Sequence, residues 1–266
     1  MNNPSSHSIL QTTDLSIGYL ASPVNTVIAS DINLDINKGE LVGIVGINGA
    51  GKSTLLRTLS GLQPTVSGEV TLSRKQIKTI SPSLLAQQLS VVLTNQPISK
   101  NLSVVELVAL GRQPYTNWLG TISDTDREVI IEALKNTETF TLKDKKCYEL
   151  SDGQLQRVLI ARALAQNTDV ILLDEPMTHL DLHHKASLLK LLTSIAHTHG
   201  KTILFSTHDI PYALNACDKM IVMKSGTTHF DTPSSLISDG VFDTLFPADN
   251  VGFDREKRIF FLKLSP

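Results

Sequence analysis

The stretch GINGAGKST at residues 46–54 constrains the fold of this chain more than any other segment. It matches the pattern G-x-x-x-x-G-K-[ST], whose glycines let the backbone wrap a phosphate group with its N–H groups pointing inward. The apolar run ELVGIVG before it is typical of a strand buried on both faces, and a helix is expected from Lys52 to about Leu59, closed by Gly61. This order of strand, loop and helix predicts a nucleotide-binding loop rather than a glycine-rich turn that matches by chance.

Two side chains of this loop have specific expected roles. Lys52 is expected to reach the β- and γ-phosphates, and the Ser53 hydroxyl is expected to bind Mg²⁺. The residues of the loop predicted to bind the nucleotide are Gly46, Asn48, Gly49, Ala50, Gly51, Lys52, Ser53 and Thr54.

Short apolar strands and helices alternate along most of the chain, which predicts a mostly parallel α/β sheet. Further strands are expected within 68–72, 89–93, 169–176 and 201–209. Helices are expected over 153–166, about three turns long, and from 181 to a stop at Gly200. Residues 9–46 have a strand pattern, residues 97–150 have a helical one, and the tail from about Phe242 is expected to form a small strand pair.

Helix starts in the 97–150 region and after it carry recognisable signals. Ser103 followed by Glu106 has the spacing of a capping box, and Ser123 precedes a second helical stretch. Ser151 and Gln154, in LSDGQLQR, have the same capping-box spacing. Helix N-termini attract anions, so the chain contains a second candidate phosphate site about a hundred residues after the first.

Acidic residues and a histidine follow two of the predicted strands. VILLDEP ends in Asp174 and Glu175, at the strand end where α/β sheets bind ligands. Asp174 is expected to hold Mg²⁺ and Glu175 to activate a water molecule as general base, whereas the alternative is a solvated acidic turn. His208 ends the strand in LFSTHD; it could contact the γ-phosphate, although a lone histidine at a strand end is more often structural.

Composition limits the class of protein. The 266 residues are 41% hydrophobic, enough for a substantial core, and the net charge of −2 provides no global basic field for nucleic acid. Cys147 and Cys217 lie far apart, as expected of a chain in a reducing cytosol. The N-terminus lacks a signal-peptide pattern and no run approaches 18 apolar residues, so we expect any membrane role to operate through a partner.

Taken in order, GINGAGKST, LSDGQLQR, VILLDEP, the segment HLD (179–181) and the histidine of STHD resemble the motif set of the ATP-binding cassette (ABC) ATPases. The resemblance covers essentially the whole chain. It implies a P-loop NTPase (RecA-like) α/β core, an N-terminal antiparallel β subdomain and an inserted α-helical subdomain. It also implies a cassette domain over 8–245, with its core at 8–96 and 151–240 and its helical subdomain at 97–150, followed by a strand-pair extension at 246–266.

The resemblance also implies why two helix starts are needed. In this family two cassettes pack head to tail, so that Ser151, Gly153 and Gln154 would contact the γ-phosphate bound by the partner's loop. Asp181 would lie at the interface of the homodimer, and Tyr19 resembles the aromatic residue that stacks on adenine, the alternative being a half-buried strand aromatic. ATP and Mg²⁺ are the implied ligands.

The chain departs from the family pattern at two places. Asp152 occupies a signature position where many members have glycine, and its side chain is expected to point away as a first-turn acid. The family usually has a Mg²⁺-contacting glutamine directly after the strand at 89–93, where this chain has Thr94, with Gln96 two residues further on. Either residue is a candidate metal ligand.

The region SVVELVALGRQPYTNWLG (103–120) resembles the helical subdomain of importers for iron–siderophore complexes, haem and cobalamin. The implied function is that of an ATPase bound peripherally to the cytoplasmic face of the inner membrane. Its implied partners are integral permease subunits and, indirectly, a periplasmic or extracellular solute-binding protein, with no nucleic acid. The alternative is the ATPase of an unfused exporter or of an importer for another solute. DNA-repair and chromosome-structure ATPases are disfavoured because the chain lacks a coiled-coil insertion and zinc cysteines.

Overall fold

The computed structural model describes residues 8–21, 24–94, 98–224, 226–246 and 251–263. Its centre is a six-stranded sheet in the order β10-β9-β3-β8-β7-β6. These strands span β3 Leu41–Gly46, β6 Leu89–Val92, β7 Val170–Leu173, β8 Thr202–Ser206, β9 Lys219–Lys224 and β10 Thr227–Asp231. The first five run parallel, and β10 pairs antiparallel with β9. Strands β3, β7 and β8 are buried along their whole length because both faces of the sheet are covered, and their sequences are accordingly mostly apolar.

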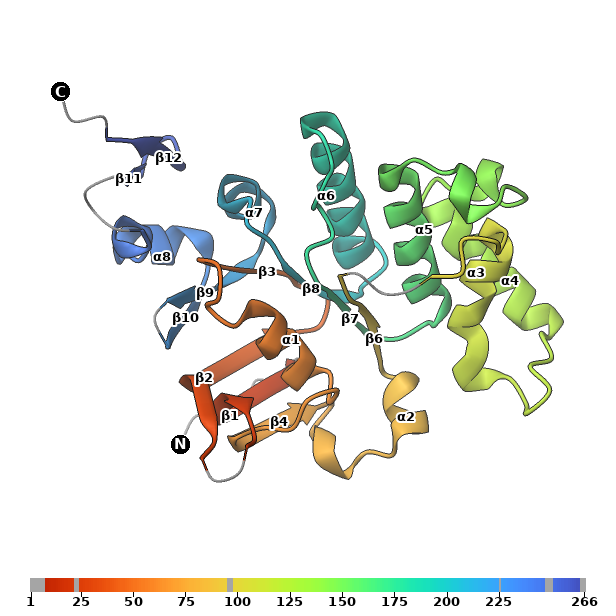
Figure 1. Cartoon of the computed structure of the whole chain (residues 1–266), viewed down its shortest axis with the longest axis horizontal. Coiled ribbons are helices and arrows are strands. Elements are labelled where there is room, and N and C mark those ends of the chain that lie inside the picture. The colour runs from red at the N-terminus through yellow and green to blue at the C-terminus, as the bar shows by residue number, and fades with distance from the viewer. Residues whose placement is uncertain (1–7, 22–23, 95–97, 225, 247–250, 264–266) are drawn as a thin grey trace.

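A second, antiparallel sheet lies below the first in Figure 1 and has the order β2-β1-β4-β5. Its strands are β1 Ser8–Tyr19, β2 Thr26–Asn37, β4 Ser67–Leu72 and β5 Lys75–Gln76. Alternate residues of β1 and β2 point into a core that they share with helix α1 (Lys52–Leu59) and one face of the central sheet. The α/β core with an N-terminal antiparallel β subdomain is therefore confirmed, and α1 has the predicted limits.

Two α-helices within the 97–150 region and the helix that directly follows it stand together at the right of Figure 1. They are α3 (Val104–Ala109), α4 (Asp124–Asn136) and α5 (Asp152–Ala165), with the 3-10 segments η2 (Leu110–Tyr115), η3 (Phe140–Leu142) and η4 (Cys147–Glu149) between them. Ser103, Ser123 and Ser151 each cap their helix in a complete capping box. Helix α5 has the 14 residues of the predicted range, shifted by one position, and these make nearly four turns rather than about three.

The remaining elements complete the covering layers. They are η1 (Ile77–Thr79), α2 (Pro82–Ala86), α6 (Leu182–His197), α7 (Ile210–Ala216), α8 (Pro233–Ser238) and η5 (Phe242–Thr244). Helix α6 ends three residues before Gly200, whose φ of +65° suits the turn into β8. The predicted C-terminal strand pair is present as β11 (Val251–Asp254) and β12 (Ile259–Leu262), attached to the core through packed phenylalanine rings, among them Phe242 and Phe253.

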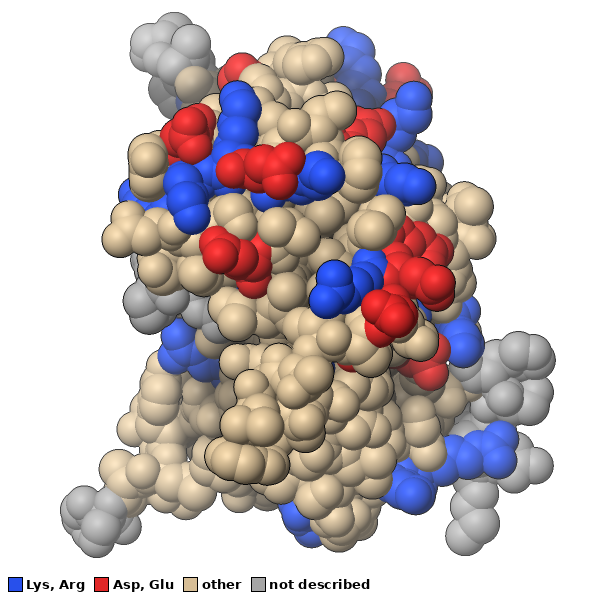
Figure 2. Space-filling view, turned by 90° about the vertical axis from the view of Figure 1, so that its right-hand side faces the viewer, with Lys and Arg blue, Asp and Glu red and all other residues tan. Residues whose placement is uncertain are grey.

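The side of the molecule formed by the helical group divides into two areas. Figure 2 shows charged side chains of both signs in its upper half and a largely uncharged surface in its lower half. The helical segment supplies several exposed apolar residues, and Trp118, the only tryptophan of the chain, is 92% exposed. Among the described residues, we find no helix whose length and apolar character would allow it to cross a bilayer.

Candidate functional site

The predicted phosphate loop connects β3 to α1, and its backbone shape requires glycine at two points. A Cβ atom at Gly46 would overlap the carbonyl oxygen of Met223 on β9. Gly51 has a φ of +100°, which L-residues rarely adopt, and caps the start of α1. Asn48 and Gly49 are exposed at the tip of the loop. The loop is thus fixed at both ends and open at its tip, as a phosphate cradle must be.

Lys52 lies inside this loop rather than in solvent. Its side chain bridges the loop: Nζ donates to the carbonyl oxygens of Gly46 at 3.0 Å and Ile47 at 3.3 Å. The residue is only 6% exposed, and this burial lowers the pKa of its ammonium group, while the nearby carboxylates of Glu175 and Asp174 oppose the shift. A phosphate anion in the loop would likewise favour the charged form, so the ammonium group is held where a polyphosphate would need it.

Asp174 follows β7 and lies directly beside the loop. Its Oδ1 accepts hydrogen bonds from Ser53 Oγ at 3.0 Å and from Ser206 Oγ at 2.8 Å. Thr94 reaches the same place, because its hydroxyl donates to the main-chain oxygen of Asp174 at 3.0 Å. The structure therefore brings Ser53, Asp174 and Thr94 together, whereas Gln96 lies outside the described residues.

The donor set suits Mg²⁺. Hydroxyl and carboxylate oxygens are hard ligands, and Mg²⁺ is commonly held by one or two carboxylates together with substrate phosphates and water. No cluster of three or more His, Cys, Asp or Glu side chains able to hold a metal occurs among the described residues. A site with one carboxylate and hydroxyl groups fits an ion that arrives with a nucleotide rather than one resident without it.

Glu175 has a backbone conformation that its own sequence does not favour. Its φ is +48°, in the left-handed region, and its N–H donates to Ser206 Oγ at 2.8 Å. The Oε1 atom contacts Nε2 of His208, and Oε2 accepts from the Thr178 hydroxyl at 3.1 Å. Strained residues held by their surroundings concentrate at functional sites. The surroundings thus fix the direction of this carboxylate.

His208 connects the acid to the lysine. Its Nδ1 atom is 3.5 Å from Nζ of Lys52, on the side opposite its contact with Glu175. Lys52, His208 and Glu175, the three residues expected to act at the γ-phosphate, therefore lie in one row. Each of them comes from a different part of the chain. The sequence pattern did not identify Ser206 or Thr178; the only signal for them was a polar residue at the buried end of β8 and a hydroxyl three residues after Glu175.

The second predicted phosphate site is the first turn of α5. Gln154 N–H donates to Ser151 Oγ at 3.3 Å and Ser151 N–H donates to Gln154 Oε1 at 3.1 Å. Ser151 and Asp152 are exposed, and the side-chain hydrogen bonds of this turn lie within α5. In Figure 1, α5 stands with α3 and α4, whereas α1 belongs to the lower layer. Ser151 is therefore accessible from outside the subunit.

The start of α6 packs beside this turn. A Cβ atom at Gly153 would lie 3.1 Å from the ring of His184, so glycine permits the close approach. Asp181 caps α6 and accepts from the His184 backbone at 2.8 Å and from its Nδ1 at 2.7 Å. These hydrogen bonds lower the pKa of the Asp181 carboxyl group. The two helix starts that were predicted to meet a partner therefore lie next to each other.

Tyr19 ends β1 and is 53% exposed. Two residues earlier, Ile17 packs against the phosphate loop, where its Cδ1 would be 3.6 Å from a Cβ on Gly51. The Gln63 side chain, just after α1, donates to the carbonyl oxygen of Gly18. Tyr19 thus follows a strand segment that packs against the phosphate loop, and about half of its surface is exposed.

Comparison with known proteins agrees with this architecture. A family model described as ABC transporter matches residues 29–178, and a model described as an AAA domain matches residues 143–215. The iron(3+)-hydroxamate import ATP-binding protein FhuC of Bacillus subtilis is 39% identical over 218 residues, 82% of this chain and 80% of that protein. The achromobactin transport ATP-binding protein CbrD of Dickeya dadantii is 34% identical, covering 90% of this chain and 88% of that protein.

Solved structures show the same relationship. A metal-chelate type ABC transporter in an inward-facing conformation has a TM-score of 0.79 and 28% identity, over 96% of this chain and 95% of that chain. A dimeric bacterial ABC transporter cassette has a TM-score of 0.73 and 28% identity, over 85% of this chain and 99% of that chain. The fold and loop define an ATP-binding P-loop ATPase. More particularly, this chain belongs to the ABC transporter family of ATP-binding cassettes.

Proposed function

We propose that this chain is the ATP-hydrolysing subunit of a membrane importer for iron chelates, such as siderophore complexes or haem, or for cobalamin. The observation that carries this proposal is the similarity along nearly the whole chain to ATP-binding proteins named for import of iron(3+)-hydroxamate, achromobactin and cobalamin. The similarity to a metal-chelate type transporter supports it. The chain would act at the cytoplasmic face of the inner membrane, with residues 97–150 as its helical subdomain and 246–266 as a C-terminal extension.

Binding of ATP begins at the loop of β3 and α1. The N–H groups of residues 46–54 would surround the phosphates, and Lys52 Nζ would exchange its bonds to Gly46 and Ile47 for bonds to the β- and γ-phosphates. Charge-assisted hydrogen bonds of this kind contribute about 1.5–3 kcal/mol each. Mg²⁺ held by Ser53 and Asp174, with Thr94 or Gln96 as a further candidate, would offset phosphate charge. Tyr19 would stack on the adenine.

Glu175 would act as the general base toward the attacking water. Its Oε2 is oriented by Thr178 and its backbone by Ser206, so the carboxylate is held in one direction before substrate arrives. His208, between Glu175 and Lys52, is close enough to both to contact the γ-phosphate. The three side chains would therefore separate when ATP binds and surround the transferred group.

A second copy would complete each site. Ser151, Gly153 and Gln154 belong to a helix start that carries a positive dipole end, and Ser151 is exposed. We propose a head-to-tail homodimer in which this turn contacts the ATP bound by the partner's loop, with Asp181 beside it at the seam. The dimeric state of the similar cassette supports this arrangement. ATP would hold the two copies together, and hydrolysis would release them.

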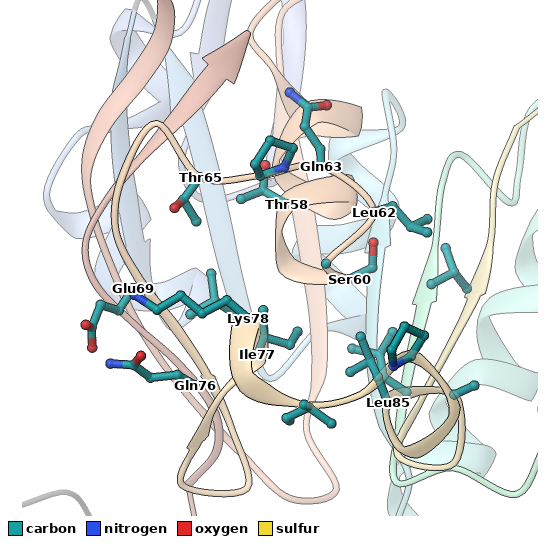
Figure 3. Close-up of a pocket in the computed structure, with 18 of the residues that line it drawn as sticks. Thr58, Ser60, Leu62, Gln63, Thr65, Glu69, Gln76, Ile77, Lys78 and Leu85 are labelled. Carbon is teal, nitrogen blue, oxygen red and sulfur yellow. The ribbon is translucent and has the colours of Figure 1, made fainter. Parts of the chain in front are cut away.

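A pocket of about 860 Å³ provides a docking position for the permease (Figure 3). It lies between the end of α1, strand β4, helix α2 and strand β6. In Figure 3 the apolar side chains of Ile77 and Leu85 face it, and Leu62 extends at its rim, where it is exposed. Glu69 and Lys78 supply charges of both signs at the opposite wall. We propose that an apolar-faced short helix of the permease occupies this pocket, so that the solute-binding protein reaches this chain only through the permease.

Reconstitution with the native permease and solute-binding protein in liposomes tests this function. We expect ATP-driven uptake of one class among ferric siderophores, haem and cobalamin, and ATPase stimulation by the loaded solute-binding protein. Efflux of solute without any need for a binding protein would instead support the alternative, an unfused export ATPase. Uptake of a different solute class would contradict the proposed specificity while leaving the ATPase assignment intact.

A further inference from the structure

The C-terminal end of α5 is capped by side chains from a distant segment. The last four carbonyl groups of a helix lack partners within the helix. Here Arg112 Nη1 donates to the carbonyl oxygen of Ala165 at 2.9 Å, and the Tyr115 hydroxyl donates to that of Gln166 at 3.0 Å. The guanidinium cation also sits at the negative end of the helix dipole. We call Arg112, Tyr115, Asp126 and Gln166 the α5 clasp.

The clasp contains a buried ion pair. Arg112 Nε donates to Asp126 Oδ1 at 2.7 Å, and both residues are only 6% exposed. Hydrogen bonds from Ser123, and then from Arg112, lower the pKa of the Asp126 carboxyl group to about 2, so it remains ionised. The Tyr115 ring lies against the guanidinium, 4.0 Å from its Cζ. A buried ion pair contributes little net stability compared with apolar packing, so its rigid geometry is the better reason for its presence.

Backbone packing leaves the clasp little freedom. A Cβ atom at Gly111 would overlap the carbonyl oxygen of Arg162 on α5 and lie 3.1 Å from the Gln166 nitrogen. The η2 backbone therefore touches α5 directly. Because α4 supplies Asp126, the end of α5 is held from two sides.

The clasp also connects α5 to the proposed docking pocket. Gln166 Nε2 donates to the carbonyl oxygens of Ala86 at 2.6 Å and Leu89 at 3.2 Å. All three of these residues line the pocket. A further bond runs from Gln87 Nε2 to the carbonyl oxygen of Pro114, at 3.1 Å. A shift of α2 or β6 would therefore be transmitted to the end of α5.

We propose that the α5 clasp is a positioning device: it sets the direction of α5 and thereby the location of Ser151 at the other end for the ATP of the partner copy. Helix α5 is about 20 Å long at 1.5 Å per residue, so a tilt of about 5° at the clasp moves its first turn by about 2 Å. Displacements of about 1 Å can change reaction rates by about a hundredfold. This proposal rests on the shared ATP site proposed above, and Arg112 and Tyr115 act through α5 without touching the nucleotide.

The test uses two clasp variants in a Glu175→Gln background. Arg112→Lys keeps a cation for Asp126 but cannot also reach Ala165, because lysine lacks the guanidinium fork. Tyr115→Phe removes only the hydroxyl bond to Gln166. Arg255→Lys, at the exposed ion pair with Asp243 on the C-terminal side, is the matched control. The dissociation constant of the MgATP-bound dimer is measured by sedimentation, and ADP affinity of the monomer by titration calorimetry.

We expect Arg112→Lys to raise the dissociation constant of the ATP-bound dimer at least tenfold and Tyr115→Phe to raise it about threefold. The ADP affinity of both variants should stay within twofold of the parent. Arg255→Lys should leave the dissociation constant of the dimer unchanged. Dimer affinity equal to the parent in both clasp variants would overturn the proposal. An equal loss of ADP and dimer affinity would also overturn it, because that result describes general destabilisation. If Arg112→Lys does not fold, the Tyr115→Phe result decides. Failure of the parent itself to dimerise with ATP would instead refute the shared site.

Discussion

Replacing Glu175 by glutamine separates ATP binding from ATP hydrolysis. The carboxylate contacts His208 and the Thr178 hydroxyl, and an amide of the same shape can accept from Thr178 while offering its NH₂ group toward the imidazole. The backbone bond from Glu175 N–H to Ser206 is unchanged by the substitution. We therefore expect the variant to fold and to bind MgATP as the parent does.

The loss appears in the chemical step. A positioned general base accelerates a reaction by about 10²–10⁴-fold, which corresponds to about 2.7–5.4 kcal/mol of barrier at 1.36 kcal/mol per tenfold. Slower hydrolysis with unchanged binding makes the ATP-bound dimer persist. Steady-state phosphate release and gel filtration with MgATP measure both effects, and Asp243→Asn, in η5, is a control for the removal of one carboxylate. Near-parental turnover by Glu175→Gln would remove this residue from the role of base.

Three further predictions concern other parts of the chain. Lys52→Ala should weaken ATP binding by at least about 10- to 150-fold, the effect of losing one of its two charge-assisted bonds at about 1.5–3 kcal/mol, as measured by calorimetry. Unchanged affinity and turnover would contradict the assignment of Lys52. The pKa of Asp126 is about 2 in the folded protein, against an ordinary value of 3.8. Its ionised carboxylate therefore adds about 2 kcal/mol to the free energy of unfolding above pH 4, and this contribution is lost as the pH falls toward 2. The difference in the free energy of unfolding between the parent and Asp126→Asn, measured by denaturant titration, should thus become smaller between pH 4 and pH 2. A difference that stays constant with pH would refute this role of Asp126. Trp118, which is exposed in the helical segment, should show a blue-shifted emission when the permease docks, and an unshifted Trp118 emission in the assembled transporter would count against contact there.

Features set by local sequence were predictable. The capping spacing at Ser103 and Ser151 gave the correct helix starts, because a capping box involves residues only three positions apart. The phosphate loop and α1 were also predicted, since the strand, the glycines and Lys52 are consecutive in the chain. The small errors fell at helix ends, where α5 begins and ends one residue earlier than expected and α6 stops at His197 rather than at Gly200.

Features that depend on sheet order could not be read from the sequence. Ser206 supports both Asp174 and Glu175 only because β8 lies between β3 and β7. The contact of His208 with Glu175 has the same origin, and a lone histidine at a strand end gave no such signal. The partner of Arg112 is likewise on another helix, and nothing in the local pattern identified Asp126 as that partner.

The most direct test of the shared site is retention of ATP by a mixed dimer. In the Glu175→Gln background, Lys52→Ala and Ser151→Arg subunits are each expected to retain no ATP in a dimer, because both sites of either homodimer are damaged. Mixing them creates heterodimers with one undamaged site, formed by the loop of the Ser151→Arg subunit and the α5 turn of the Lys52→Ala subunit. The account predicts one retained ATP per heterodimer. Retention of ATP by Ser151→Arg subunits alone would contradict the shared site. Retention of no ATP in the mixture, when the parent dimer retains two ATP molecules, would also contradict it.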